Sequence, residues 1–227
     1  MEAVLNLELT DSGPLPGAEN MALDAALMEA AAQSGRPQGR VYAWARPTLS
    51  LGYFQRLEQV AELGELQEMG VDVVQRITGG GAILHQHELT LALALPAGHP
   101  WAKLAVNACY LQLTQPLVDA LRGLGVEAGF RGEAPTLKAP NCFAGSACAD
   151  VVVAGKKLFG SAQRRKGEAL LLHGSLLMDI DQELWSRVFG ERVGLGYTSL
   201  RALGQPLSYP ELSAALRRAY EAALGTV

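Results

Sequence analysis

Three consecutive glycines, Gly79 to Gly81, constrain the fold of this chain most. They follow a short apolar segment at residues 71–77, which is typical of a β-strand, and no helical pattern follows them. Such a run lets the backbone approach a ligand closely and point its N–H groups at it. Because no Gly-Lys-Ser/Thr and no helix follow, the segment is neither a P-loop nor a dinucleotide-binding fingerprint. Triple glycine alone also fits a flexible turn or a bulge.

Strand-like and helix-like segments are mixed along the rest of the chain without a strict strand–helix–strand rhythm. Further strands are predicted at residues 4–9 (ending in a turn at 10–14), 40–45, 49–53, 82–96 (two antiparallel strands joined by a polar turn) and 168–178. Helices are predicted at residues 18–33, 57–69, 102–124, 182–189 and 208–224. This mixture predicts the α+β class, with a central mixed β-sheet flanked by helices.

A hairpin is the second informative feature. A short apolar run at residues 151–154 ends at Gly155, so we expect a strand that enters a tight turn. Lys156 and Lys157 leave that turn, and alternation along a strand predicts that their side chains point in opposite directions. A segment of small residues that lets other groups approach the backbone follows: Gly160, Ser161 and Ala162.

Cys142 lies shortly before this hairpin, fifteen residues before Lys157. A thiol that becomes a thiolate, next to an ammonium that stabilises it, is the chemistry of acyl transfer through a thioester. The alternative interpretation is structural, because most cysteines are small buried hydrophobes and lysines are common in solvated hairpins. The segment at residues 129–141 that leads to Cys142 has no periodicity and is predicted to be a loop.

Two more side chains suggest binding. Arg76, directly before the glycines, can bind a carboxylate, a phosphate or a carbonyl group. His173 and Gly174 interrupt an apolar strand pattern, which marks a place where another group approaches. A hydrogen-bonded core histidine explains His173 equally well.

Together these segments resemble the lipoate–protein ligase and octanoyltransferase family. The matching motifs are Glu19-Asn20-Met21-Ala22-Leu23-Asp24, Trp44…Pro47…Gly52-Tyr53, Arg76-x-Thr78-Gly79-Gly80-Gly81-Ala82-x-x-His85, Gly155-Lys156-Lys157-x-x-Gly160-Ser161-Ala162-Gln163 and His173-Gly174-Ser175-Leu176-Leu177. The resemblance covers roughly residues 18–180 and implies the fold of the biotinyl and lipoyl protein ligases, with an acyl tunnel between the sheet and the glycine loop. Since about one helix follows Gln205, we expect residues 1–227 to form a single catalytic domain without an accessory C-terminal domain.

The resemblance also implies site residues. Cys142 and Lys157 correspond to the catalytic pair of the cysteine-dependent octanoyltransferases. The implied substrate-binding residues are Arg76, Thr78, Gly79, Gly80, Gly81, His85, Gly160, Ser161, Ala162 and His173. We expect apolar side chains around residues 82–84 and Leu172 to line the acyl channel. Backbone N–H groups of the two small-residue segments are candidates to bind an oxyanion.

Three activities fit this resemblance. The first is transfer of octanoate (or lipoate) from acyl carrier protein, through a Cys142 thioester, to a lysine of a lipoyl domain or of glycine cleavage H protein. That reaction requires no cofactor. The second is an ATP-dependent lipoate–protein ligase, which uses ATP and Mg²⁺ and an acyl adenylate, and the third is an octanoyl amidotransferase between lipoyl domains. A non-catalytic acyl- or biotin-binding module is the alternative from another class.

Composition and charge narrow the partners and the compartment. A net charge of −4 argues against nucleic acid, while local basic spots can still face an acidic partner. No apolar run reaches the roughly 18 residues that span a membrane, and no charged-then-apolar leader is present. The three cysteines are Cys109, Cys142 and Cys148, a sparse odd number that suits a reducing compartment, so we expect a cytoplasmic protein. The histidine spacing suggests no metal site.

Overall fold

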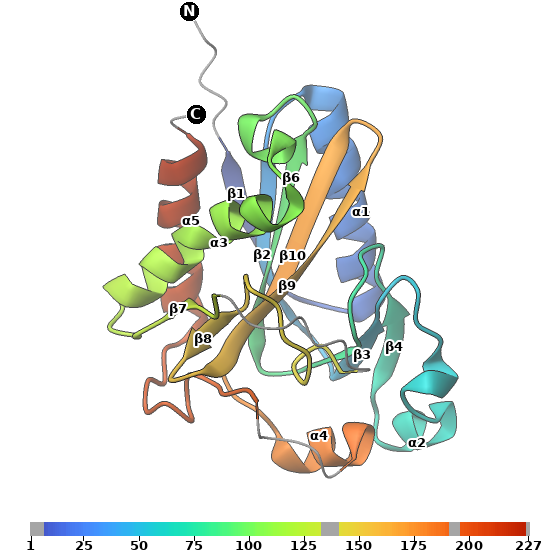
Figure 1. The fold of residues 1–227 in the computed structure, drawn as a ribbon. Coiled ribbons are helices and arrows are strands. Elements are labelled where there is room, and N and C mark those ends of the chain that lie inside the picture. The colour runs from blue at the N-terminus through green and yellow to red at the C-terminus, as the bar shows by residue number, and fades with distance from the viewer. Residues whose placement is uncertain (1–6, 133–140, 191–195, 226–227) are drawn as a thin grey trace, which may run out of the picture.

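The computed structural model describes residues 7–132, 141–190 and 196–225 and contains two β-sheets flanked by helices (Figure 1). In spatial order the large sheet contains β1 (Glu8–Leu15), β2 (Gln38–Trp44), β6 (Glu88–Pro96), β10 (Ala169–Leu177), β9 (Lys156–Lys166), β8 (Val151–Val153) and β7 (Gly129–Phe130). The small sheet contains β4 (Asp72–Gln75), β3 (Thr48–Leu51) and β5 (Ile83–His85). β1–β2 and β3–β4 are parallel and the other pairs are antiparallel, so the predicted mixed-sheet α+β architecture is confirmed.

Helices cover both faces of the large sheet. The helices of the described chain are α1 (Gly17–Ser34), α2 (Leu63–Glu68), α3 (Val106–Gly123), α4 (Gln182–Phe189) and α5 (Tyr209–Leu224), with short 3₁₀ helices η1 (Leu57–Gln59) and η2 (Pro100–Lys103). α3 and α5 pack together on one face, and α1 lies on the other face, between the large sheet and β4 (Figure 1). No helix in the described part of the chain is long and apolar enough to cross a membrane.

Side-chain alternation along β6 explains the two layers. Leu89, Leu91 and Leu93 belong to the core that α3 and α5 cover, whereas Ala92 and Ala94 pack with Met28 and Ala31 of α1. The small alanine side chains let α1 approach the sheet closely. This approach brings residues from the start of α1 to the cavity described below.

Local signals set several element boundaries as predicted. The backbone of Gly35 is left-handed at the C-terminal end of α1. Asp181 caps the N-terminus of α4 by accepting a hydrogen bond from Leu184 N–H. Ser208 and Glu211 form a capping box at the start of α5.

Three predictions about elements are wrong. β1 continues through the predicted turn at residues 10–14, because these residues form an irregularity in the strand between Asp11 and Pro14 instead of ending it. The two strands at residues 82–96 do not pair, since β5 pairs with β3 and β6 pairs with β2 and β10 in the other sheet. The segment at residues 57–69 forms η1 and α2 rather than one helix.

Candidate active site

The hairpin between β8 and β9 presents Lys157 to the interior. Ala154 and Gly155 form its turn with positive φ values of 49° and 75°, the conformation of a tight two-residue hairpin turn. Lys156 is exposed, whereas Lys157 is only 3% exposed, so the predicted opposite orientation of the two side chains is confirmed.

Lys157 has a fixed set of partners. Its Nζ atom lies 2.8 Å from Asp150 Oδ1 and donates a hydrogen bond to the Cys142 carbonyl oxygen at 3.1 Å. It also lies 5.3 Å from the centre of the Phe143 ring. Asp150 was not singled out from the sequence, although it directly precedes the strand that starts the hairpin. The sequence contained one signal for this role of Asp150, an acidic residue close to the lysine that was expected to be catalytic.

Backbone contacts hold Cys142 against the end of the glycine loop. Asn141 forms an isolated parallel bridge with Ala82, and the Cys142 N–H donates to the Ala82 carbonyl oxygen at 2.9 Å. The Asn141 side chain accepts a hydrogen bond from the Phe143 N–H at 2.8 Å, which fixes the turn that carries Cys142. Most of the predicted loop before Cys142, residues 133–140, lies outside the described residues.

Gly160 connects the thiol and the ammonium. A Cβ atom on Gly160 would lie 2.5 Å from Cε and 2.9 Å from Nζ of Lys157, and 3.9 Å from Sγ of Cys142. Both reactive side chains therefore approach the same patch of β9 backbone, which only glycine leaves open.

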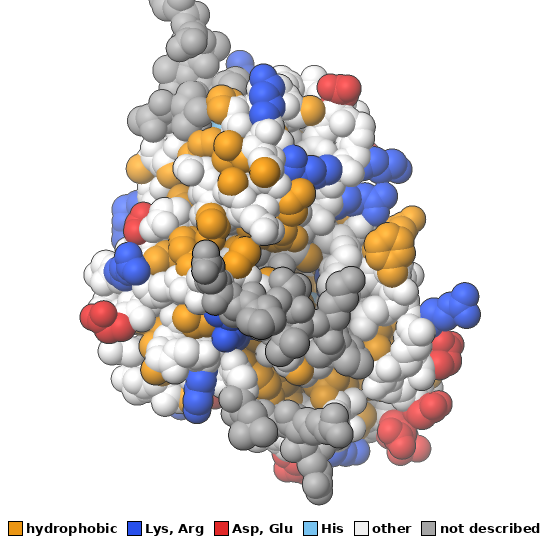
Figure 2. Space-filling view, in the orientation of Figure 1, with side chains coloured by type: hydrophobic (Ala, Val, Ile, Leu, Met, Phe, Trp, Pro, Cys, Tyr) orange, Lys and Arg blue, Asp and Glu red, His pale blue; other side chains and the backbone are white. Residues whose placement is uncertain are grey.

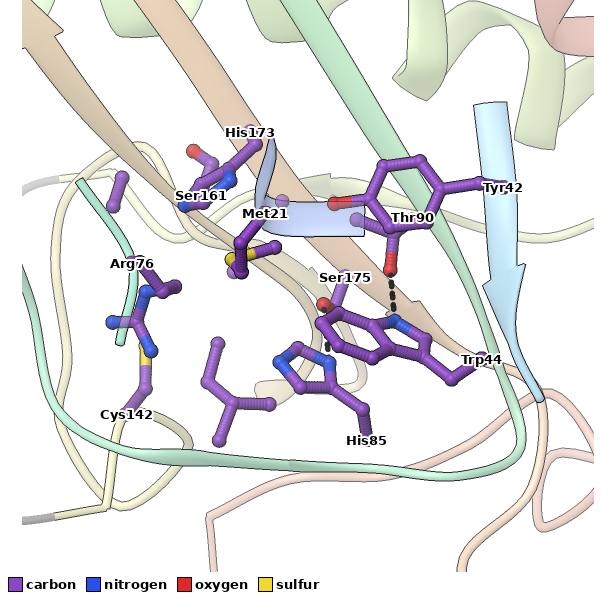
Figure 3. A pocket seen from close by; sticks show the side chains of 14 residues that line it. Met21, Tyr42, Trp44, Arg76, His85, Thr90, Cys142, Ser161, His173 and Ser175 are labelled. Atoms are coloured by element: carbon purple, nitrogen blue, oxygen red, sulfur yellow. Dashed lines mark hydrogen bonds between the residues drawn. The ribbon is translucent and has the colours of Figure 1, made fainter. Parts of the chain in front are cut away.

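Arg76 holds the glycine loop. Its Nη1 donates to the carbonyl and hydroxyl oxygens of Ser50 (2.8 and 2.9 Å), and its Nη2 donates to the carbonyl oxygens of Gly79 (3.0 Å) and Gly81 (2.9 Å). Burial lowers the pKa of the Arg76 guanidinium, and the negative charge of an ionised Cys142 works against this shift. Arg76 thus shapes the loop, and Figure 3 shows its guanidinium beside the Cys142 side chain.

Gly52 explains how two backbones meet here. Its missing Cβ would lie 2.0 Å from the Gly80 carbonyl oxygen. Gly80 itself has a φ of 97°, a conformation that other residues rarely adopt. The Tyr53 N–H donates to the Thr78 carbonyl oxygen at 2.8 Å, so the segment after β3 is hydrogen-bonded to the start of the loop.

We call one side of the site the glycine-loop wall; it consists of Ser50, Arg76, Thr78, residues 79–81, His85 and His173. Two buried imidazoles belong to it. The Nε2 of His85 lies 2.6 Å from the Ser50 hydroxyl, and its Nδ1 lies 2.5 Å from a Glu88 carboxylate oxygen. The Trp44 ring stacks on His85 at 3.8 Å between ring centres. Burial lowers the pKa of His85, against the raising effect of the Glu88 carboxylate.

His173 repeats the arrangement with other partners. Its Nε2 lies 2.5 Å from the Thr78 hydroxyl, and its Nδ1 lies 2.9 Å from a carboxylate oxygen of Asp24 in α1. Asp24 also binds Arg40 (2.9 Å) and the Tyr42 hydroxyl (2.8 Å). Since protein groups engage both nitrogens of both imidazoles, these residues position the loop in this structure. The sequence assigned no role to Asp24, Ser50 or Glu88, although Asp24 ends one of the matching motifs.

The wall and the cysteine enclose a small cavity of about 10 Å³, enough for about one water molecule (Figure 3). Of the predicted site residues, the cavity is lined by Arg76, His85, Cys142, Gly160, Ser161, Ala162 and His173. Ile83 lines the cavity, whereas Ala82 and Leu84, which pack in the same hydrophobic cluster as Ile83, do not. The prediction for Leu172 is wrong: it packs on the opposite face of β10, because neighbouring residues on a strand face opposite sides. Met21, Tyr42 and Trp44 are lining residues with no assigned binding role in the sequence prediction.

The site contains the Cys142 thiol, the buried cations Arg76 and Lys157, and a cavity with mostly apolar walls. Among the described residues, no group of three or more His, Cys, Asp or Glu side chains is arranged to hold a metal ion. The arrangement can activate the thiol and enclose an apolar group next to it.

Comparisons with known proteins show which family this chain is similar to. A model of the lipoyl protein ligase A/B catalytic domain matches residues 16–221. The chain is 40% identical over 174 residues to octanoyltransferase LipM of Carboxydothermus hydrogenoformans, covering 76% of this chain and 65% of that protein. It is 38% identical over 188 residues to octanoyltransferase LipM of Geobacillus kaustophilus, covering 79% and 68%. The chain thus spans about two thirds of the length of these relatives.

Solved structures show the same fold. A lipoate-protein ligase A bound with ATP superposes with a TM-score of 0.74 at 23% identity, covering 96% of this chain and 85% of that one. A bipartite lipoate protein ligase from Thermoplasma acidophilum, studied with its E2 lipoyl domain, has a TM-score of 0.69 at 22% identity, covering 97% and 84%.

Proposed function

We propose, because this chain belongs to the lipoyl protein ligase A/B catalytic domain family, that it is an octanoyltransferase of protein lipoylation which works through a Cys142 thioester. The observation that carries the proposal is that Cys142 and Lys157 approach the same point beside Gly160, next to a small apolar cavity that Cys142 and Arg76 line. Relatives that are 36–40% identical and named octanoyltransferases support the same activity.

The first step acylates the enzyme. The Cys142 thiolate attacks the thioester carbonyl of octanoyl-acyl carrier protein. A new C–S bond to Cys142 forms, the C–S bond to the carrier breaks, and the carrier leaves as a thiolate that takes up the proton that the Cys142 thiol gave up. The thioester of the donor is already activated, and the step needs no nucleotide. Backbone N–H groups at residues 79–81 and 160–162 are our candidates to bind the oxyanion.

The second step releases the product. The ε-amine of a lysine on a lipoyl domain, or on glycine cleavage H protein, attacks the octanoyl-Cys142 carbonyl. A C–N bond forms, the C–S bond breaks, and the sulfur leaves as the thiolate that started the cycle. The attacking amine must lose a proton during this step, so a base near Cys142 is required.

Lys157 serves the first step directly. The ammonium is hydrogen-bonded to the Cys142 carbonyl oxygen and ion-paired with Asp150. Its Nζ and the Cys142 Sγ lie 2.9 Å and 3.9 Å from the same point, where a Cβ atom on Gly160 would be, so the positive charge is near the sulfur. For the second step Lys157 would have to give up a proton, and its Nζ is ion-paired with Asp150 Oδ1 at 2.8 Å. Lys157 as the base of the second step therefore remains a prediction that kinetics must test.

Arg76 supplies the second positive charge. It is 2% exposed, and no carboxylate of the described chain lies within 4.0 Å of its guanidinium. A buried charge is costly without an anion, and the partners of Arg76 are neutral oxygens. A negative charge on the Cys142 sulfur, or the charge that develops on the carbonyl oxygen under attack, would give Arg76 an anionic partner. In this role Arg76 stabilises the reacting atoms as well as the loop.

Octanoate has to enlarge the cavity. Burial of each CH₂ group contributes about 0.8 kcal/mol, so an eight-carbon chain gains substantially from apolar walls. Tyr42, Trp44 and His85 are fixed by hydrogen bonds, whereas Met21 is partly exposed and has a flexible side chain. Met21 is therefore our candidate for the side chain that moves when the acyl group enters.

The remaining parts of the proposal are a cytoplasmic location, no required cofactor, and a single catalytic domain over residues 1–227. A ligase would need ATP and Mg²⁺, with Lys157 and Arg76 against an acyl adenylate. An amidotransferase would use the same thioester but would take octanoate from H protein.

The test is to weigh the intact protein after mixing it with octanoyl-acyl carrier protein in the absence of ATP. We expect a mass increase of one octanoyl group that hydroxylamine removes, followed by transfer to an apo lipoyl domain. Strict dependence on ATP and free acid would overturn the proposal in favour of the ligase. Acylation only by octanoyl-H protein would identify the amidotransferase.

A further inference from the structure

A groove of about 270 Å³ lies on the outer side of the glycine loop. Its walls include Tyr53 and Phe54 from the segment after β3, Gly79 of the loop, and Arg164, Arg165 and Lys166 at the end of β9. We call this surface the aromatic-basic groove. Figure 2 shows hydrophobic side chains next to Lys and Arg side chains toward the right-hand edge of this face.

The three basic residues of the groove lack anionic partners. No carboxylate in the described part of the chain lies within 4.0 Å of Arg164, Arg165 or Lys166. The chain as a whole has a net charge of −4, so this concentration of positive charge runs against its average composition. An uncompensated basic patch attracts a partner with an acidic surface.

The two arginines are held in place before any partner binds. Arg164 donates to the Ile77 carbonyl oxygen at 2.6 Å and lies over the Tyr53 ring at 4.8 Å. Arg165 donates to the carbonyl oxygens of Ala102 (2.9 Å) and Leu104 (3.0 Å). Because these bonds use neutral oxygens, they fix the side chains and leave their charge unpaired, which lowers the entropy lost on binding.

Phe54 provides an apolar anchor. It is 86% exposed, the highest value among the large hydrophobic side chains of the described residues, and it packs edge-on against Tyr53 at 5.0 Å. Aromatic residues and arginine are the types that most often contribute strongly to protein–protein binding.

The groove ends close to the nucleophile. Gly79 lines it, and three residues further on the Ala82 carbonyl oxygen accepts the Cys142 N–H. Three residues of chain span at most about 10 Å. A partner docked here can deliver a group on a short arm, such as a lysine side chain with four methylenes, whereas a carrier with a long flexible arm has no need to dock so near.

We propose that the aromatic-basic groove docks the acceptor domain through an acidic surface that lies beside its target lysine. This inference rests on the proposed function and adds the surface that recognises the second substrate. Phe54 contacts an apolar spot of the acceptor, and Arg164, Arg165 and Lys166 face its carboxylates.

The test separates the two half-reactions in two variants, Phe54→Ala and Lys166→Glu. Matched controls are Leu63→Ala, 49% exposed in α2, and Arg218→Glu, exposed on α5. We expect KM for the apo lipoyl domain to rise by roughly tenfold or more in the two groove variants and to stay near wild type in the controls. Acylation of Cys142 by octanoyl-acyl carrier protein, measured by intact mass, should remain unchanged in all four. Salt should weaken acceptor binding less in Lys166→Glu than in wild type.

Slower acylation with an unchanged KM for the acceptor would assign the groove to the donor and overturn the proposal. Unchanged values in both half-reactions would make the groove an ordinary solvated surface. Calorimetric titration of the unacylated protein with apo lipoyl domain gives an independent readout. If wild type binds and the groove variants do not, the docking site stands even where the thioester mechanism fails.

Discussion

Two parts of the site are built from different kinds of contact. The glycine-loop wall consists of Ser50, Arg76, Thr78, residues 79–81, His85 and His173. There, side-chain hydrogen bonds link hydroxyl, imidazole, carboxylate and guanidinium groups, and nearly every polar atom has a protein partner. The cysteine corner consists of Cys142, Asp150, Lys157 and Gly160, and backbone bonds hold its nucleophile while no described hydrogen bond fixes the sulfur.

The glycine-loop wall therefore contributes mainly to stability, and the cysteine corner contributes the reacting groups. Removing one member of the wall leaves a buried polar group without a partner, which costs about 1–3 kcal/mol of the free energy of unfolding. Changing the cysteine corner removes a reacting group from a backbone that stays in place. We therefore expect wall variants to lose stability first and corner variants to lose activity first.

The most severe break is Cys142→Ser. A hydroxyl is a poor nucleophile without a strong base, so octanoyl transfer should fall by roughly 10³-fold or more. The melting temperature should change by no more than about 2 °C, because the backbone bonds of residue 142 remain. Cys148→Ser, half-buried six residues away, is the matched control and should transfer octanoate normally, as should Cys109→Ser. Transfer at the wild-type rate by Cys142→Ser would contradict the thioester mechanism.

Lys157→Ala should follow in size. It removes the ammonium beside Cys142, so acylation and transfer should both slow by about 10²-fold. Lys156→Ala, exposed on the opposite side of the strand, should remain close to wild type. Single-turnover measurements of each half-reaction check this. Loss in the second step alone would indicate that Lys157 acts only as the base, and equal losses in both variants would point to a general effect of hairpin charge.

Gly160→Ala tests the corner without removing a reacting group. The new methyl group would lie 2.5 Å from Cε of Lys157 and must displace that side chain, so we expect a loss of activity of about tenfold or more. Gly98→Ala is the control, because no atom lies within 4 Å of its added Cβ. The measurement is kcat together with the melting temperature. Full activity in Gly160→Ala would mean that Lys157 need not occupy its observed position.

The smallest expected effect is the contribution of His85, in the glycine-loop wall, to the pH dependence of stability. His85 has a pKa below its usual value in the folded protein, so the unfolded chain binds a proton that the folded protein does not bind. The contribution of His85 to the free energy of unfolding is complete above about pH 6.5 and is lost as the pH falls toward the folded-state pKa. Over that range the free energy of unfolding falls by at most about 1.4 kcal/mol per pH unit. Urea unfolding of wild type and His85→Gln between about pH 7.5 and about pH 5.5 (roughly one unit on either side of 6.5) measures this slope. His99→Gln is the comparison, because burial lowers its pKa as well. Identical slopes in wild type and His85→Gln would exclude His85 as the source.

The sequence predicted the features that are local in the chain. The turn at Gly155, the opposite orientation of Lys156 and Lys157, and the boundaries of α4 and α5 follow from neighbouring residues. The partners of the imidazoles were missed because Asp24 and His173 are 149 positions apart and no periodicity links them. Leu172 was assigned to the cavity because its strand was known but the face of each residue was not, and a one-residue change of register exchanges the two faces.

Sheet membership also lay outside what local patterns contain. The polar turn between β5 and β6 has the composition of a hairpin turn, yet it carries the chain from one sheet to the other. Pairing energy from β2, β3 and β10 decides this, and those strands are distant in sequence.

The contact between Gly52 and Gly80 has an evolutionary consequence. A β-carbon at position 52 cannot coexist with the observed path of the loop, since it would lie 2.0 Å from a carbonyl oxygen. Single substitutions at position 52 should therefore be purged, even though Gly52 is remote from the thiol in sequence and contributes no reactive atom. Lineages that replace Gly52 are expected to have rebuilt the glycine loop first. We therefore expect a survey of substitutions tolerated by selection to find positions 52 and 80 changing together or not at all.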